Sequence, residues 1–182
     1  MRDMDVDEPI RTLVIAAASR HGGTDEMADR LASTLRGELA APWTVERTDP
    51  SDLGSLDAAD AVVLGSAIYM GQWLRPALHA LNFLEGTAPR GLWLFSTGPV
   101  SDEESDNARV ISADSMVEAG LATEHRVFGG RLDRSRLNMA ERVVVALVRA
   151  KPGDHRDWEQ VDAWAHHIAQ QLSSTPSATK DQ

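Results

Sequence analysis

The chain has 182 residues, of which 42% are hydrophobic, and its formal net charge is −10. This length suits one domain with a full-sized core, and the absence of cysteine excludes disulfides, cysteine-ligated zinc and thiol catalysis. The acidic balance argues against nucleic-acid binding, and no apolar run approaches the roughly 20 residues that span a bilayer. Residues 1–10 form an acidic leader, predicted to be disordered, without the pattern of a secretion signal. We therefore expect a cytoplasmic protein.

Apolar runs and helical repeats alternate along the rest of the chain. Residues 12–18 are apolar throughout, which is typical of a strand buried on both faces. The four-residue spacing of Met27, Leu31 and Leu35 predicts an amphipathic helix that begins near Thr24, with Thr24 as its N-cap. Similar patterns predict further strands at 44–47, 61–65, 92–96 and 123–128, and further helices at 53–58, 76–84, 110–119 and 158–172.

This alternation predicts an α/β fold of the flavodoxin-like type, a doubly wound five-stranded parallel sheet in the order 2-1-3-4-5. We expect one domain over residues 11–172, a helical insertion at about 129–156 before the last helix, and a disordered tail over 173–182. Ligands of such sheets bind outside the carboxyl ends of the strands, where the strand order reverses. The loops after Ala18, Gly65 and Ser96 are therefore the candidate binding loops.

The first loop, residues 19–24, has the composition of a phosphate-binding turn. Gly22 and Gly23 let the backbone turn its amides inward, Ser19 and Thr24 supply hydroxyl donors, and Arg20 adds positive charge. An ordinary turn between a strand and a helix has similar residues, so the loop alone leaves both interpretations open. The chain lacks G-x-G-x-x-G and G-x-x-x-x-G-K-[ST], the usual signs of dinucleotide and nucleoside triphosphate binding.

The second loop, residues 65–73, is unusually apolar for a surface segment. Its residues Ile68, Tyr69, Met70 and Trp73 suit the flat face of an isoalloxazine ring, although they would also suit packing on a helix or a second subunit. The third loop, residues 97–100, is placed to bring backbone groups to the polar edge of the same ring. Together these two loops predict where a flavin ring would lie.

Other motifs point to chemistry less clearly. Residues 94–98 are similar to the nucleophile elbow of hydrolases, but the first glycine is absent and the sequence suggests no His–Asp pair. The histidines at 125, 155, 166 and 167 have no recognised metal spacing, so we interpret them as solvated or capping residues and predict no metal site. Trp158 and Trp164 are interpreted as core or subunit packing.

Three segments carry a resemblance to a known family. Residues 19–24 (SRHGGT) resemble the flavodoxin phosphate loop [ST]-x-[ST]-G-x-[ST], with His21 in place of a hydroxyl residue. With residues 65–71, residues 153–159 and the insertion, the chain resembles the flavodoxin-domain group that includes menaquinone-dependent protoporphyrinogen oxidase. The resemblance implies an FMN enzyme that passes electrons from a reduced organic substrate to a quinone.

The three loops together supply the candidate FMN-binding residues. Catalysis would belong to the flavin, and no catalytic side chain is assigned. Two other functions stay open, an electron carrier of the flavodoxin type without its own substrate and a flavin-free binding module. The candidate residues are Ser19, Arg20, His21, Gly22, Gly23, Thr24, Ser66, Ala67, Ile68, Tyr69, Met70, Gly71, Trp73, Ser96, Thr97, Gly98 and Pro99.

Two charged segments bear on the substrate and the partners. The resemblance implies basic residues in and after the third loop, whereas residues 102–106 are mainly acidic and would repel an anionic porphyrinogen. Residues 126–156 contain eight basic and only three acidic residues. Within residues 131–151, the apolar residues at 137, 144, 145, 147 and 148 predict a short helix suited to an anionic membrane surface, where a lipid quinone is accessible. Packing on the protein's own core, or in a homo-oligomer, is the alternative.

Overall fold

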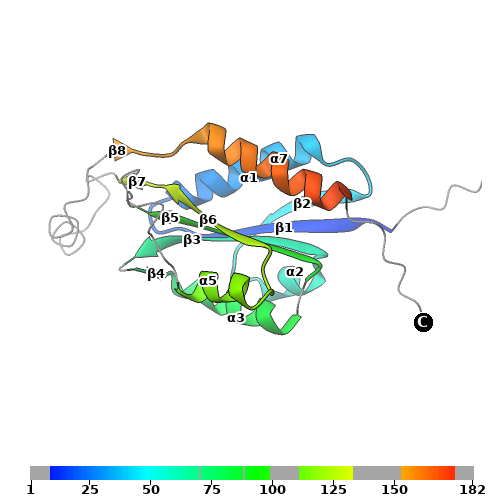
Figure 1. The fold of residues 1–182 in the computed structure, drawn as a ribbon, viewed down its shortest axis with the longest axis horizontal. Helices are drawn as coiled ribbons and strands as arrows, with labels where there is room; N and C mark the ends of the chain where they lie inside the picture. Colours follow the sequence, from blue (N-terminus) through cyan, green and yellow to red (C-terminus); the bar gives the residue numbers. More distant parts are fainter. Residues whose placement is uncertain (1–8, 70, 88, 99–110, 133–152, 175–182) are drawn as a thin grey trace, which may run out of the picture.

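The computed structural model describes residues 9–69, 71–87, 89–98, 111–132 and 153–174. A parallel sheet forms its centre, with helices on both faces (Figure 1). The strands run in the order β2-β1-β3-β5-β6, which confirms the predicted fold class and strand order. These strands are β1 (Arg11–Ala18), β2 (Trp43–Thr48), β3 (Ala61–Tyr69), β5 (Gly91–Gly98) and β6 (Glu124–Gly129).

The helices divide between the two faces of the sheet (Figure 1). Helices α1 (Gly23–Glu38) and α7 (Trp158–Ser174) cover one face. The other face is covered by α2 (Leu53–Ala58), α3 (Arg75–Thr87) and α5 (Ile111–Glu118). Each helix lies within three residues of its predicted bounds, because the apolar spacing that marks it also forms its buried side.

The interior strand β1 shows why the predicted strands are mainly apolar. Leu13 and Ile15 belong to the core beneath α1 and α7, whereas Val14 and Ala16 belong to the core beneath α2, α3 and α5. Successive side chains of a strand point to opposite faces. A strand covered on both faces is therefore apolar at most of its positions, and these four residues are at most 1% exposed.

The prediction of a loop over residues 65–73 was wrong in its extent. Strand β3 continues to Tyr69, turns at Gly71 (φ +75°), and pairs in antiparallel fashion with the short strand β4 (Gln72–Trp73). The apolar composition reflects this hairpin, whose backbone groups bond within the sheet and whose Trp73 side chain is buried, whereas Ile68 and Tyr69 are partly buried. The hairpin lies at the carboxyl end of the sheet, beside the candidate site.

The described ends of the insertion also lie at the carboxyl end of the sheet. Strands β7 (Arg131–Leu132) and β8 (Gly153–Asp154) form a separate antiparallel pair. The amide of Gly130 donates to the carbonyl of Gly98 (2.6 Å), and a Cβ at position 130 would lie 2.7 Å from that carbonyl oxygen. Glycine is therefore required where the insertion leaves β6.

Several sequence predictions fall outside the described residues. They concern Met70, Pro99, the acidic residues 102–106, the basic amphipathic segment within 133–152, and most of the leader and the tail. Helix α7 extends to Ser174, slightly beyond the predicted domain end at 172. Within the described ranges, no helix combines the length and the apolar character needed to span a bilayer.

Candidate functional site

The first candidate loop leads directly from β1 into α1. Gly22 has φ +84° and is the N-cap of α1, and no side chain caps the helix. The prediction that Thr24 is the N-cap was therefore wrong, because the left-handed glycine turns the chain two residues earlier. The first-turn N–H groups of a helix have no partners within it, so this uncapped start presents donors suited to an anion.

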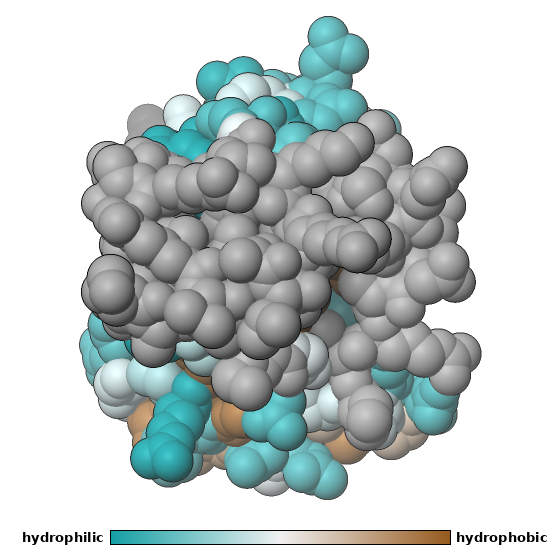
Figure 2. Space-filling view, turned by 90° about the vertical axis from the view of Figure 1, so that its left-hand side faces the viewer, coloured by the Kyte–Doolittle hydropathy of each residue, from teal (hydrophilic) through white to brown (hydrophobic). Residues whose placement is uncertain are grey.

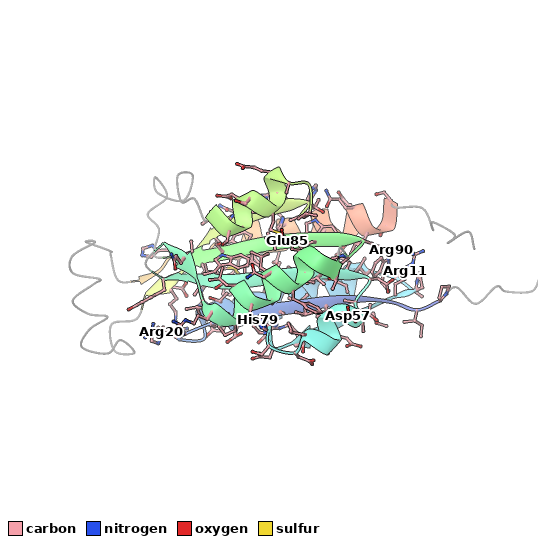
Figure 3. The ribbon with its side chains drawn as sticks, turned by 90° about the horizontal axis from the view of Figure 1, so that it is seen from below. Arg11, Arg20, Asp57, His79, Glu85 and Arg90 are labelled. Atoms are coloured by element: carbon pink, nitrogen blue, oxygen red, sulfur yellow. The ribbon has the colours of Figure 1, made fainter. Side chains whose placement is uncertain are left out.

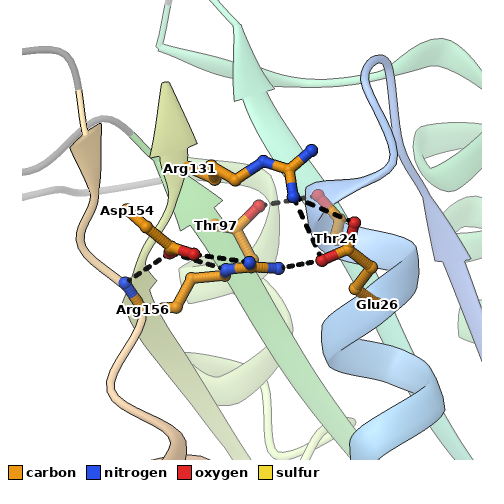
Figure 4. Close-up of polar contacts among 6 residues, drawn as sticks. All are labelled: Thr24, Glu26, Thr97, Arg131, Asp154 and Arg156. Atoms are coloured by element: carbon orange, nitrogen blue, oxygen red, sulfur yellow. Dashed lines mark hydrogen bonds and ion pairs between the residues drawn. The ribbon is translucent and has the colours of Figure 1, made fainter. Parts of the chain in front are cut away.

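Thr24 instead links the first and third candidate loops. Its side chain is buried, with 2% exposure, and its Oγ1 lies 2.7 Å from Oγ1 of Thr97 at the end of β5 (Figure 4). Both threonines were predicted as site residues, and the structure brings them together beneath the loops. Their hydroxyls fix the start of α1 against the end of β5.

Two arginines from the insertion lie beside the start of α1 (Figure 4). Arg131 Nη1 is 3.2 Å from a carboxylate oxygen of Glu26, and Arg156 Nη1 is 2.6 Å from the other. Arg156 also pairs with Asp154, and its side chain is only 5% exposed. The hydrogen bonds from Arg156 lower the pKa of Asp154, and those that Asp154 accepts raise the pKa of Arg156. This arginine–carboxylate cluster anchors both ends of the insertion to α1.

The sequence prediction missed Arg131, Glu26, Asp154 and Arg156 as parts of the site. The segment 153–159 was recognised as part of the family resemblance, but no role was assigned to its charged residues. The pairs that Glu26 forms with Arg131 and Arg156 cross 105 and 130 positions of the chain. A contact over that separation leaves no pattern in one sequence.

The first and second candidate loops meet through Arg20. Its guanidinium carbon lies 4.5 Å from the centroid of the Tyr69 ring, a cation–π arrangement. Arg20 is exposed at the carboxyl end of the sheet, whereas Arg90 and Arg11 lie at the opposite end (Figure 3). Ala67, Ile68 and Tyr69 are partly buried on the hairpin. Among the candidate ring contacts that the structure describes, those that remain accessible therefore come from the β3–β4 hairpin.

Two predicted site residues, Ser66 and Ser96, use their hydroxyls inside the protein. They are register partners on β3 and β5, and both are fully buried. The amide of Leu74 donates to Ser66 Oγ (2.9 Å), and the indole of Trp73 donates to Ser96 Oγ (2.7 Å). Trp73 is itself only 3% exposed. Trp73 is thus a core residue, as in the packing alternative, and not an exposed cover for a ring.

The structure overturns the interpretation of His125 as a solvated or capping histidine. Its side chain is 4% exposed, Nε2 lies 2.7 Å from Ser96 Oγ, and Nδ1 lies 2.8 Å from Asp114 Oδ1. The His–Asp pair that the sequence did not suggest is therefore present beside the serine of the elbow-like segment. Among the described residues, no group of three or more His, Asp or Glu side chains is arranged to hold a metal ion.

Figure 2 views the molecule from the side on which the strands β1, β3 and β5 end. Of the described residues, hydrophilic ones gather on the side of α1 and α7, and apolar ones appear among them on the side of α3 and α5 (Figures 1 and 2). The uncapped helix start and the arginines belong to the first side, and the Trp73 and Ser96 contacts to the second.

This arrangement defines a class of protein. The model of the flavodoxin domain matches residues 14–159, and the chain therefore belongs to the flavodoxin domain family. Family membership confirms the flavodoxin-like fold and the expected cofactor, because flavodoxin domains bind FMN. This match is to the flavodoxin domain in general and is not specific to the protoporphyrinogen oxidase group.

Solved structures show the same fold at low sequence identity. A flavodoxin from the domain Archaea is 15% identical, with a TM-score of 0.58 over 89% of this chain and 99% of its own. Oxidised flavodoxin 2 from Bacillus cereus is 21% identical, with a TM-score of 0.56 over 89% and 99% of the two chains. Rubredoxin oxygen:oxidoreductase from Desulfovibrio gigas is 19% identical, with a TM-score of 0.59 over 92% of this chain, which spans only 37% of that protein. No curated protein sequence matches the chain.

Proposed function

We propose that the chain is a redox protein that holds FMN with its phosphate at the start of α1 and its ring at the β3–β4 hairpin. One observation carries this proposal. The left-handed Gly22 ends the loop after β1 and leaves α1 without a side-chain cap, at the point where the strand order reverses. A phosphate bound there would accept N–H bonds and interact favourably with the helix dipole.

The residues around this point fit FMN. Gly22, Gly23 and the amides of the first turn would hold the phosphate, and Arg20 would add a positive charge. Ile68 and Tyr69 would contact the ring from one side, and the backbone of Thr97 and Gly98 would reach its polar edge. When bound, the flavin would supply the electron-transfer chemistry, and the protein would bind and orient it.

The proposed activity is transfer of electrons from a reduced organic substrate to a quinone-type acceptor. Its support is the resemblance of residues 19–24, 65–71 and 153–159 to the oxidase group, together with the basic segment 131–151 as a proposed peripheral membrane contact. The second candidate is an electron carrier, favoured by the net charge of −10, which suits docking to a basic redox partner. Assembly as a homo-oligomer is compatible with both. Turnover of a quinone in steady state distinguishes the enzyme from the carrier.

Flavin binding is tested by comparing FMN with riboflavin. We expect the purified protein to bind FMN at least tenfold more tightly, because the donors of the first loop serve only the phosphate. Arg20→Gln should weaken FMN binding by about 1–2 kcal/mol, the scale of a charge-assisted contact. Arg90→Gln, which removes the same charge from the opposite end of the sheet, is the matched control (Figure 3).

Calorimetric titration and flavin fluorescence give the affinities. Equal affinity for FMN and riboflavin would contradict the phosphate site at α1. A protein that binds neither flavin would favour the flavin-free binding module instead.

A further inference from the structure

A continuous chain of hydrogen bonds runs from Trp73 through Ser96 and His125 to Asp114. The successive donor–acceptor distances are 2.7, 2.7 and 2.8 Å. The four side chains come from β4, β5, β6 and α5, so the hydrogen bonds connect the β3–β4 hairpin, across the carboxyl half of β5, to the start of β6 and to α5. Exposure rises outward, from fully buried Ser96 through His125 at 4% to Asp114 at 34%.

The donor and acceptor properties of the four side chains fix the direction of each hydrogen bond in this series. An indole N–H only donates, and an ionised carboxylate only accepts. For a neutral imidazole, Ser96 therefore accepts from Trp73 and donates to His125 Nε2, and His125 carries its proton on Nδ1 and donates it to Asp114. Each group acts in the same sense, and aligned bonds of this kind polarise and strengthen one another.

The same residue types, Ser, His and Asp, form the catalytic triads of hydrolases. Here, however, the serine is not placed to attack a substrate. Ser96 has no exposed surface, and the indole of Trp73 donates directly to its Oγ. The Trp73 and His125 rings also meet edge to face, with centroids 6.2 Å apart. A buried serine with these two hydrogen bonds serves to fix the positions of Trp73 and His125.

Through Trp73, the hydrogen bond to Ser96 fixes the position of the β3–β4 hairpin. Trp73 pairs with Ile68 across the hairpin, and Gln72 pairs with Tyr69. Ser66 provides a second attachment by accepting from the amide of Leu74. Because Ser66 and Ser96 are adjacent in register, the two serines fix β4 against both β3 and β5.

We propose that His125 and Asp114 are positioning residues for the flavin ring. Acting through Ser96 and Trp73, they set the distance between the hairpin that carries Ile68 and Tyr69 and the end of β5. Removal of one link leaves a buried donor or acceptor unsatisfied, and the hairpin loses its fixed position. This inference rests on the proposed function, and it concerns the ring and not the phosphate.

The test compares FMN, riboflavin and inorganic phosphate as ligands of the full chain. His125→Leu and Ser96→Ala should each weaken FMN and riboflavin by the same factor, about five- to tenfold, the scale of one lost hydrogen bond. Inhibition of FMN binding by inorganic phosphate should be unchanged. His125→Gln should restore part of the affinity, because its amide oxygen can accept from Ser96. His79→Leu, on the exposed side of α3, is the control (Figure 3).

Two further measurements keep the test informative if a variant is unstable. Binding is measured well below the melting temperature of each variant, with the stoichiometry reporting the folded fraction. The NMR signal of the Trp73 indole N–H should shift in His125→Leu and less in His125→Gln. Unchanged riboflavin affinity in both His125→Leu and Ser96→Ala would overturn the inference, as would a loss confined to FMN. A wild-type protein that binds neither flavin would instead refute the proposed function, and the inference with it.

Discussion

At the scale of single residues, four hydroxyl groups that the sequence predicted to bind the ligand form hydrogen bonds inside the protein instead. Thr24, Thr97, Ser66 and Ser96 are all at most 6% exposed, and each bonds to a partner outside its own helix or strand. The sequence places these residues in the correct loops because loop positions follow from strand ends. The partner of each hydroxyl was not predictable, because for Ser96, Thr24 and Thr97 it lies 23 or 73 positions away along the chain.

The Thr24–Thr97 pair gives a prediction at this scale. Thr24→Val should lower the free energy of unfolding by about 1–3 kcal/mol, because it leaves the buried hydroxyl of Thr97 without its partner. The double variant Thr24→Val/Thr97→Val should cost less than the sum of the two single variants, since it removes both groups. Urea unfolding of the four proteins measures this coupling. Additive losses would show that the 2.7 Å contact contributes nothing.

At the scale of elements, the apolar pattern predicted the helices and the strands of the parallel sheet, but not the β3–β4 hairpin or the β7–β8 pair. Two-residue strands such as β4 and β7 are too short to show periodicity. Their positions come from tertiary contacts, namely the Trp73–Ser96 bond for β4 and the Arg131–Glu26 pair for β7.

The ion pairs of β8 give a prediction of pH dependence. The hydrogen bonds from Arg156 hold the pKa of Asp154 below its ordinary value of 3.8. A carboxyl with a depressed pKa stabilises the fold above its unfolded pKa, and this stabilisation is lost as the pH falls through the folded pKa. The wild type should therefore exceed Asp154→Asn in stability by about 1 kcal/mol at pH 5–7, and the difference should shrink below about pH 4.

Thermal unfolding of both proteins from pH 7 to pH 3 provides the measurement. Asp57→Asn, on the exposed side of α2, controls for the loss of one negative charge (Figure 3). A difference between wild type and Asp154→Asn that stays constant down to pH 3 would argue against a role for the Asp154–Arg156 pair.

At the scale of the whole molecule, the distribution of charge is uneven. The chain carries −10 overall, yet residues 126–156 contain eight basic and three acidic residues. Two arginines of this segment form ion pairs: Arg131 pairs with Glu26 of α1, and Arg156 pairs with both Glu26 and Asp154. The basic residues from 134 to 151 lie outside the described residues, and for them the membrane contact remains a proposal from the sequence.

Liposome binding tests this proposal. We expect the protein to co-sediment with vesicles of anionic lipid at low salt and to be released at high salt, because screening weakens surface electrostatics. Arg142→Glu/Arg149→Glu should abolish the binding, whereas Arg36→Glu/Arg90→Glu changes the net charge equally at other exposed sites. Absence of binding by the wild type at low salt would favour a protein that acts away from the membrane.

The sequence by itself determined the fold class, the strand order and the loops that meet at the site. Burial on both faces requires apolar strands, amphipathic spacing marks the helices, and right-handed connections then leave the first, second and third loops at one edge of the sheet. These are local or topological rules, and they need no knowledge of which distant side chains touch. The family resemblance predicted FMN as the cofactor, and it too rested on short motifs, each contained in one segment of the sequence.

Only the tertiary structure decided which polar groups are left for a ligand. The Thr24 hydroxyl turns to Thr97, the Ser96 hydroxyl lies between Trp73 and His125, and helix α1 begins without a side-chain cap. A buried polar group must find a hydrogen-bond partner, and that partner is the nearest suitable group in space and not in sequence. For Ser96 and His125 it lies 29 positions away, and for Thr24 and Thr97 it lies 73 positions away.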